Sequence, residues 1–153
     1  LTACKLDSAV QVYRHSGEGY RAGSVTGQTV LEDMDLSRAE GGIFCGIYNQ
    51  EDDLVGVVDF VPAGFSGLPD SACVRSLKIS AEFQGKGWAG KTLERLEEEL
   101  KKDGSLKWIW SCFRDDCPDW KEFSTRHGYR LVDEEERSRF HLPEDVAWVK
   151  ILA

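Results

Sequence analysis

The stretch Gln84–Thr92 reads Gln-Gly-Lys-Gly-Trp-Ala-Gly-Lys-Thr and is the most informative part of this chain. Its glycines predict a turn, and the run that follows, Lys91–Lys102, has the composition of a helix. Such a turn gathers backbone N–H groups at a helix N-terminus, where unpaired donors and the positive end of the helix dipole act together. The segment is therefore predicted to bind a phosphate-bearing ligand.

The same letters match the P-loop of nucleotide-binding proteins, G-x-x-x-x-G-K-[ST], through Gly85, Gly90, Lys91 and Thr92. A P-loop directly follows a buried parallel strand, which reads as an unbroken apolar run. Here the preceding strand alternates between apolar and polar positions, and four further residues separate it from the first glycine. Because the later run Trp108–Asp116 resembles a Walker B strand that ends in two aspartates, a P-loop kinase remains an alternative.

Patterns along the rest of the chain predict a mixed α/β architecture. Asn49–Asp53 is expected to be the turn of a hairpin, and Pro62–Asp70 a loop. The expected elements are helical segments between Leu6 and Ser37, strands Gly42–Asn49, Leu54–Val61 and Ala72–Ser80, a helix from Trp88 to about Lys102, a strand Leu106–Phe113, a helix Pro118–Arg126, and closing strands Tyr129–Val132 and Val146–Leu152.

The main helix is expected to bury one face and expose the other. It places three leucines at core spacing, namely Leu93, Leu96 and Leu100. Glu97 and Lys101 stand four residues apart and are expected to pair on the outer face. The acidic stretches Glu94–Glu99 and Asp133–Glu136 are both expected to be exposed, as charge runs usually are.

At 153 residues and 41% hydrophobic content, the chain is expected to form one domain, residues 1–153. Its apolar runs are too short to span a membrane and no signal peptide is recognisable, so no membrane partner is expected. The single methionine is Met34, which suggests that Leu1–Leu6 is the remnant of a longer first strand. Five scattered cysteines, an odd number without a CxxC pair, indicate reduced thiols in a cytoplasmic protein.

The net charge and the spacing of the cysteines limit the kinds of partner that are expected for this chain. A formal net charge of −8 disfavours nucleic acid, because binding to phosphate backbones depends on Lys and Arg. The charge fits either a solvated acidic surface or an acidic cleft that attracts a cationic amine. No metal is expected, since Cys112, Cys117 and His127 do not have zinc-ligand spacing.

Three motifs, in this order, resemble the GNAT superfamily of acetyl-CoA-dependent N-acetyltransferases. Leu77–Phe83 is similar to the family's strand exit, L-x-V-x-P-x-[YF], and Gln84–Ala89 to its pyrophosphate loop, [QR]-x-x-G-x-[GA]. Arg114–Pro118 followed by Phe123–Tyr129 is similar to R-x-D-N-P…[LF]-Y-x-x-x-G-[FY]. The match spans about Gly42–Val132. It implies a mixed, mostly antiparallel GNAT-type sheet flanked by helices, in a single layered domain.

The resemblance implies that acetyl-CoA is bound as a co-substrate. Backbone groups of Leu77, Lys78 and Ile79 would pair with the pantetheine arm, and amides of the glycine turn would hold the pyrophosphate. The remaining expected CoA contacts are Gln84, Gly85, Lys86, Gly87, Trp88, Ala89, Gly90 and Cys117. By residue chemistry alone, Lys86 and Lys91 either add positive charge or are merely solvated. Trp88 is favoured as a core anchor over a ligand contact.

Two catalytic positions depart from the family pattern. The tyrosine that protonates the leaving thiolate in many relatives is replaced by Ser124, a far weaker acid, and the family's asparagine by Cys117. A glutamate base found in relatives falls near Cys73. Asp59, in the otherwise apolar strand Leu54–Val61, is the candidate replacement base if it faces the cleft with a raised pKa. The alternative is that Asp59 points to solvent.

These observations predict an N-acetyltransferase in which the primary amine of a small molecule or peptide attacks acetyl-CoA directly, in a ternary complex and without metal. The acceptor is expected to enter beside Pro62–Asp70 and Gly17–Ser37. The protein is expected to be a monomer or a homodimer. A catalytically weak acyl-CoA-binding sensor or interaction module, and a P-loop kinase, are the alternatives.

Overall fold

The computed structural model describes residues 2–3, 5–15, 27–102, 104–112, 118–144 and 146–152. Short 3-10 turns at Phe65–Gly67 and Ala81–Phe83 precede and follow the long strand Ser71–Ile79. The elements are β1 (Thr2–Ala3), α1 (Leu6–His15), α2 (Gly27–Ala39), β2 (Ile43–Tyr48), β3 (Leu54–Val61), β4 (Ser71–Ile79), α3 (Trp88–Lys101), β5 (Trp108–Ser111), α4 (Pro118–Arg126), β6 (Arg130–Leu131), α5 (Glu134–Phe140) and β7 (Trp148–Ile151).

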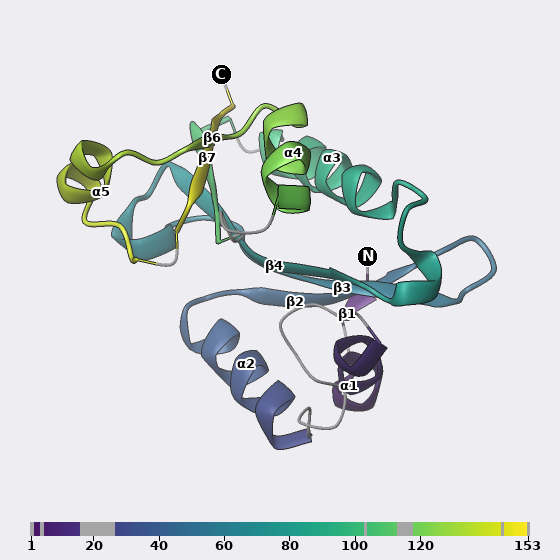
Figure 1. Ribbon diagram of the computed structural model, residues 1–153. Coiled ribbons are helices and arrows are strands. Elements are labelled where there is room, and N and C mark those ends of the chain that lie inside the picture. Colours follow the sequence, from purple (N-terminus) through teal and green to yellow (C-terminus); the bar gives the residue numbers. More distant parts are fainter. Residues whose placement is uncertain are drawn as a thin grey trace.

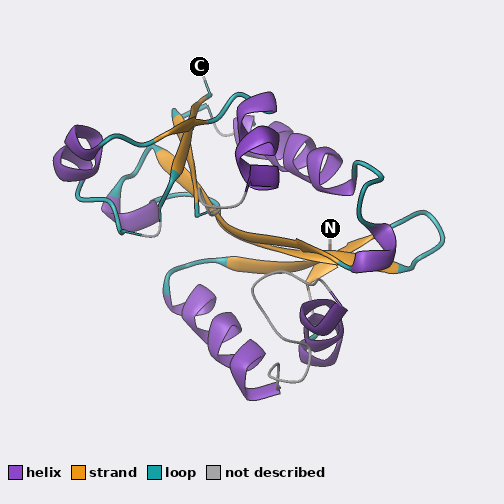
Figure 2. Cartoon of the chain, viewed as in Figure 1, coloured by secondary structure: helices purple, strands orange, loops and turns teal. Residues whose placement is uncertain are grey.

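The strands form one seven-stranded sheet in the order β1-β2-β3-β4-β5-β7-β6. Neighbouring strands run antiparallel, except β4 and β5, which run parallel. Helices α1 and α2 cover one face of the sheet, and α3 and α4 cover the other (Figure 1). The predicted mixed, mostly antiparallel sheet flanked by helices is therefore confirmed. The strands β5 to β7 run across the direction of β2 to β4, so the sheet is strongly twisted (Figure 2).

Apolar side chains fill the layers on both faces of the sheet. Leu93, Leu96 and Leu100 of α3 are all buried against the sheet, as their spacing predicts. Burying each leucine contributes roughly 1.5–3 kcal/mol relative to leaving it exposed. On the opposite face, Val12 of α1 and Val30 of α2 pack against β3. The helical segments expected between Leu6 and Ser37 are thus α1 and α2, and each packs an apolar side chain against β3.

The prediction that Glu97 pairs with Lys101 on the exposed face of α3 is wrong. Glu97 is only 6% exposed, and it accepts hydrogen bonds from Tyr129 Oη at 3.0 Å and from Lys150 Nζ at 2.9 Å. Tyr129 follows α4, and Lys150 lies in β7. This carboxylate therefore joins α3 to β7 and to the segment between α4 and β6 inside the protein, which a helix-face pattern does not reveal.

The expectation that Asp133–Glu136 is an exposed charge run is confirmed for Asp133, Glu134 and Glu135 but is wrong for Glu136, because the run begins the helix α5 and its fourth residue is buried. The Asp133 carboxylate accepts from the Glu136 N–H at 2.7 Å, and the Glu136 carboxylate accepts from the Asp133 N–H at 3.4 Å. These two bonds form a capping box. Glu136 is 7% exposed, and its carboxylate also accepts a bidentate pair of hydrogen bonds from the Arg130 guanidinium, at 2.6 and 2.7 Å.

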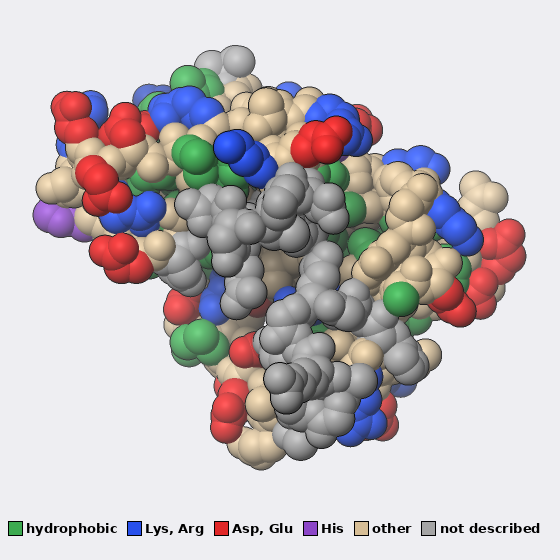
Figure 3. Space-filling model, viewed as in Figure 1, with side chains coloured by type: hydrophobic (Ala, Val, Ile, Leu, Met, Phe, Trp, Pro, Cys, Tyr) green, Lys and Arg blue, Asp and Glu red, His purple; other side chains and the backbone are tan. Residues whose placement is uncertain are grey.

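Most of the other described acidic side chains are exposed. On the face of the molecule drawn in Figure 3, acidic side chains gather near the two ends, over α5 and over the turn between β2 and β3, with basic side chains interspersed. This distribution fits the solvated acidic surface that the net charge of −8 suggests. Among the described helices, none combines the length and the apolar character that crossing a bilayer requires.

Candidate functional site

The C-terminal half of β4 has an open backbone edge. Its parallel pairing with β5 runs from Ser71 to Val74 and is continued only by the Cys112 N–H, which donates to the Val74 carbonyl at 3.1 Å. Pairing with β3 continues on the other side as far as Ile79, across a register shift that leaves Arg75 as an extra residue. Within the described residues no strand pairs with the β5 side of β4 beyond Val74. The two parallel strands therefore part at this point.

The open edge presents the peptide groups of Leu77 and Ile79. Ser80 donates to β3 at 2.9 Å, and because successive peptide groups alternate along a strand, those of Leu77 and Ile79 face away from β3. Lys78 turns its backbone toward β3, and its ammonium lies 5.1 Å from the centre of the Tyr13 ring. Of the three strand residues expected to contact a ligand, two thus face the opening.

The glycine turn is folded back onto the end of β4. The Gln84 side-chain amide donates to the Ile79 carbonyl at 2.8 Å, which fixes the start of the turn. Gly85 and Gly87 have φ angles of 76° and 82°, a left-handed conformation that favours glycine. A Cβ at either position would meet no atom within 4 Å, so the conformation and not crowding requires glycine. The space above the turn is open to a ligand.

Helix α3 begins with unpaired donors at this turn. Gly87 is its N-cap and provides no side-chain cap, and the first helical bond runs from the Lys91 N–H to the Gly87 carbonyl at 3.0 Å. The N–H groups of Trp88, Ala89 and Gly90 therefore have no acceptor within the helix. Over a 14-residue helix the aligned peptide dipoles add a partial positive charge at the same end. This geometry fits a pyrophosphate.

Two lysines add charge around the helix start. The Lys86 ammonium lies 5.8 Å from the centre of the Phe83 ring, and the Lys91 ammonium lies 5.2 Å from that of Trp88. Both contacts keep the lysines beside the turn through attraction between a cation and an aromatic face. Both lysines are exposed, so they remain free to approach an anionic ligand.

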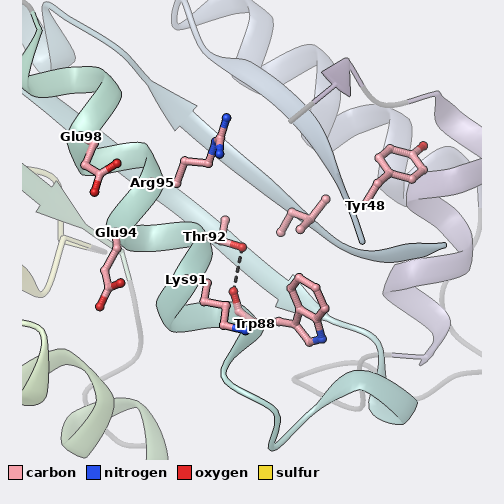
Figure 4. Close-up of a pocket in the computed structure, with 8 residues that line it drawn as sticks. Tyr48, Trp88, Lys91, Thr92, Glu94, Arg95 and Glu98 are labelled. Atoms are coloured by element: carbon pink, nitrogen blue, oxygen red, sulfur yellow. Dashed lines mark hydrogen bonds between the residues drawn. The ribbon is translucent and has the colours of Figure 1, made fainter. Parts of the chain in front are cut away.

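A cavity of about 390 Å³ adjoins the helix start. Figure 4 shows Trp88, Lys91 and Arg95 of α3 on one side of it and Tyr48 of β2 across from them. Because β2 and β5 lie on opposite sides of β4 in the sheet, this cavity flanks α3 on the side away from the open edge. Its lining combines basic, acidic and aromatic side chains: Ile47, Tyr48, Trp88, Lys91, Thr92, Glu94, Arg95 and Glu98.

Asp59 does not point to solvent. It is 4% exposed and faces α2, where the Ser37 hydroxyl donates to Oδ1 at 2.5 Å. Arg75 Nε lies 3.8 Å from Oδ2. Burial raises the pKa of Asp59, and the Ser37 hydrogen bond and the Arg75 charge counteract this only in part. Asp59 pairs in register with Ser76, so it lies one strand away from the open edge.

Two buried hydroxyls lack a hydrogen-bond partner among the described residues. They are Ser124 Oγ in α4 and Ser111 Oγ at the end of β5, and both residues are fully buried. Ser111 shares a sheet face with Ile109, which packs with α3, so its hydroxyl faces the layer of α3 and α4. A buried hydroxyl without a partner costs about 1–3 kcal/mol, which a bound ligand or water would offset. Cys117 lies outside the described residues.

Comparison with known protein families shows which family the chain belongs to. Residues 9–129 match the model of the acetyltransferase (GNAT) family. This chain belongs to the GNAT family. In a search by sequence, no curated protein matches it.

Solved structures of GNAT acetyltransferases share the fold. An acetyltransferase from Thermus thermophilus aligns with a TM-score of 0.75 at 18% identity, over 99% of this chain and 93% of that chain. An acetyltransferase of the GNAT family from Staphylococcus aureus gives 0.70 at 13% identity, over 97% and 93%. The PaiA N-acetyltransferase of Thermoplasma acidophilum, in complex with coenzyme A, gives 0.67 at 16% identity, over 99% and 95%.

The GNAT fold leaves the P-loop kinase interpretation without support. The turn follows β4, which is antiparallel to β3 and parallel to β5 only from Ser71 to Val74. A 3-10 turn, Ala81–Phe83, also intervenes before the first glycine. A P-loop instead joins a buried parallel strand directly to its helix.

The described residues contain no group of three His, Cys, Asp or Glu side chains that could hold a metal ion.

Sequence reasoning missed three residues that the structure places in or beside the candidate site. Ser37 and Arg75, which contact Asp59, lie 22 and 16 positions from it in the chain, and no local pattern joins them. The third is Ser111. A polar residue that ends the apolar strand Trp108–Ser111 is the signal that would have drawn attention to it.

Proposed function

We propose that this GNAT-family chain is an N-acetyltransferase that moves the acetyl group of acetyl-CoA to a primary amine in a ternary complex. The observation that carries the proposal is the open edge of β4, which leads through Gln84–Gly87 to the uncapped start of α3. An extended amide-bearing arm and a pyrophosphate together match this edge and this helix start. A neighbour of the same fold, PaiA, was solved with coenzyme A, which supports the proposal.

The chain's own part is to bind and align. Acetyl-CoA, when bound, supplies the activated thioester. The peptide groups of Leu77 and Ile79 would pair with the pantetheine arm, while the amides of Trp88, Ala89 and Gly90 would hold the pyrophosphate. Holding two reactants in place in this way supplies much of the rate of acyl transfer to a neutral amine.

Asp59 is proposed as the general base, and Ser124 as the hydrogen-bond donor to the leaving group. An amine attacks only after losing its proton, and the raised pKa of the Asp59 carboxyl makes it a better acceptor than an ordinary aspartate. Ser37 and Arg75 would hold that carboxylate in place. The Ser124 hydroxyl, buried without a partner in the described part of the chain, would donate a hydrogen bond to the leaving sulfur.

The acceptor is proposed to be a small-molecule or peptide amine that approaches from the face covered by α2. Asp59 faces this side, and the loop Pro62–Asp70 follows β3 directly. Residues 17–26 of the other expected entry segment lie outside the described residues. The cytoplasmic location and a monomeric or homodimeric state stay predictions.

An acyl-CoA sensor is the second candidate function. One observation favours it: both positions where relatives carry an acid and a base hold poor substitutes. Ser124 takes the place of the tyrosine, and Cys73, near the glutamate position, is fully buried in an apolar cluster. A protein with this site would bind acyl-CoA without efficient turnover.

Calorimetry followed by a turnover assay tests these functions. We expect CoA and acetyl-CoA to bind and Mg-ATP not to bind. We further expect thiol release from acetyl-CoA when a panel of primary amines is added. Binding without thiol release across the panel would favour the sensor. Heat with Mg-ATP and none with CoA would overturn both candidates.

A further inference from the structure

Two thiols touch at the point where β4 and β5 part. Cys73 lies in β4 and Cys112 directly follows β5, and their sulfur atoms are 3.8 Å apart. Cys73 is in register with Trp110, so Cys112, two residues further on, faces the same side of the sheet. Both side chains pack in the same apolar cluster. The contact follows from the topology, because the two cysteines are 39 positions apart.

The two thiols differ in access. Cys73 is fully buried, whereas Cys112 is partly exposed. A small oxidant in solution therefore reaches Cys112 before Cys73, and among the described residues Cys73 offers a thiol in contact with the sulfur that is oxidised. An exposed thiol beside a second, resolving thiol is the arrangement that favours reversible oxidation over irreversible damage.

From this contact we infer that Cys73 and Cys112 form a reversible disulfide when the protein meets a peroxide. The Cys112 thiolate attacks the peroxide, the O–O bond breaks, and Cys112 becomes a sulfenic acid while hydroxide leaves. The Cys73 sulfur then attacks the sulfenic sulfur, the S–S bond forms, and water leaves. Two electrons pass in total from the two thiols to the peroxide. A small dithiol reverses the reaction by thiol–disulfide exchange.

The bond requires a modest movement. A disulfide has an S–S distance of about 2.05 Å, so the two sulfurs must approach by roughly 1.8 Å from their present contact. Rotation of the two side chains supplies part of this approach. Cys112 lies just past the last residue of β5, so its backbone is held to β4 by a single hydrogen bond to Val74 rather than by a strand ladder.

The disulfide would act on the proposed CoA site, and this consequence rests on the proposed function. It would join β4 to the residue after β5 beside Val74, where the open edge of β4 begins. A covalent link there restricts the separation of the two strands that a pantetheine arm requires. We therefore expect the oxidised protein to bind CoA at least tenfold more weakly than the reduced protein.

Mass spectrometry on matched cysteine variants tests the disulfide itself. One variant keeps only Cys73 and Cys112, and a control keeps only Cys45 and Cys112. Cys45 is also buried, but it packs in a different cluster. After hydrogen peroxide, we expect the first variant to lose two hydrogen atoms, to give one cross-linked peptide pair, and to recover with dithiothreitol. Oxidised Cys112 without a cross-link, or equal cross-linking in the control, would overturn the inference.

Binding measurements separate this inference from the proposed function. We expect peroxide to weaken CoA binding by wild-type protein at least tenfold, dithiothreitol to restore it, and Cys112→Ser to lose this sensitivity. A cross-linked protein that binds CoA as tightly as the reduced one would overturn the regulatory consequence. If reduced protein does not bind CoA at all, the proposed function fails. The disulfide is then still tested independently by mass spectrometry on the cysteine variants.

Discussion

Asp59, the proposed general base, is a buried carboxylate held by two neighbouring side chains. It is almost fully enclosed between β3 and α2, yet it has a hydroxyl donor in Ser37 and a nearby cation in Arg75. Burial of an ionised carboxyl is unfavourable unless such groups accompany it. The balance still leaves the pKa of Asp59 raised. This residue therefore gives the most direct tests at the scale of a single side chain.

Replacing Asp59 tests the proposed general base. We expect Asp59→Asn to lower kcat/KM about 100-fold or more, which is typical of losing a positioned base, without changing the Kd for CoA. Activity of the wild type should fall as the pH drops through the raised pKa of Asp59, and the variant should lack this acidic limb. Asp35→Asn, on the exposed face of α2, is the control. An Asp59→Asn protein with the wild-type pH profile would exclude the base role.

The same pKa shift predicts how stability changes with pH. Because the folded state holds the Asp59 proton more tightly than the unfolded chain, this group stabilises the fold most below the ordinary aspartate pKa. That contribution is lost as the pH rises through the raised pKa. Urea unfolding from about pH 3 to about pH 7 should therefore show Asp59→Asn gaining stability relative to wild type as pH rises. A relative loss with rising pH would contradict the shift.

At the scale of single elements, the start of α3 combines helix electrostatics with ligand binding. The unpaired amides of Trp88, Ala89 and Gly90 and the helix dipole favour any negative charge placed there. A carboxylate on the protein and a ligand phosphate would thus compete for one place. Replacing a positive by a negative side chain at the N-terminus of α3 should therefore affect the stability of the helix and the affinity for CoA in different directions.

Lys86→Glu should have opposite effects on these two quantities. We expect it to weaken CoA binding roughly tenfold, or about 1.4 kcal/mol, while leaving the melting temperature unchanged or higher. Lys101→Glu makes the same charge change at the other end of α3 and is the matched control. It should leave the Kd nearly unchanged and destabilise the helix. Equal effects of both variants on the Kd would show that only net charge matters.

The capping box of α5 gives a second test at this scale. Asp133→Ala removes the carboxylate that accepts from the Glu136 N–H, and we expect a loss of about 1 kcal/mol in the free energy of unfolding. Glu134→Ala alters the same first turn, but the Glu134 side chain is 93% exposed and lies outside the box. It should change stability by only a few tenths of a kcal/mol. Urea denaturation compares the two, and similar losses would contradict the cap.

At the scale of the whole molecule, a few long-range polar contacts hold the layers together. The Glu97 carboxylate in α3 receives bonds from Tyr129, which precedes β6, and from Lys150 in β7. Burial and the nearby carboxylate both raise the pKa of Tyr129, so the phenol stays protonated and remains a donor. This cluster joins the main helix to the strands at the far end of the sheet.

Tyr129→Phe tests that connection. It removes one donor from the buried Glu97 carboxylate while keeping the aromatic ring, and we expect a loss of about 1–3 kcal/mol in the free energy of unfolding. Tyr48→Phe, at a tyrosine that is 39% exposed, is the control and should be close to neutral. A Tyr129→Phe protein as stable as the control would show that Lys150 alone satisfies the carboxylate.

Element types were largely predictable from the sequence, but the boundaries and roles of polar residues were not. The apolar run Leu54–Val61 and the leucine spacing in α3 are local signals, and both elements lie where these signals place them. The helix α5 was missed although Asp133 and Glu136 have capping-box spacing, because the run was interpreted only as an exposed run of charges. Burial of Glu97 could not be predicted, since its partners are 32 and 53 positions away.

By itself, the sequence determined the glycine turn at Gln84–Gly87 and the helix that follows it. The reason is local: positive φ angles require glycine there, and the first amides of any helix lack partners. Only the tertiary structure decided which peptide groups of β4 stay open, which side chains enclose Asp59, and that Cys73 touches Cys112. These features depend on the register and separation of strands that are distant along the chain, and no local pattern encodes them.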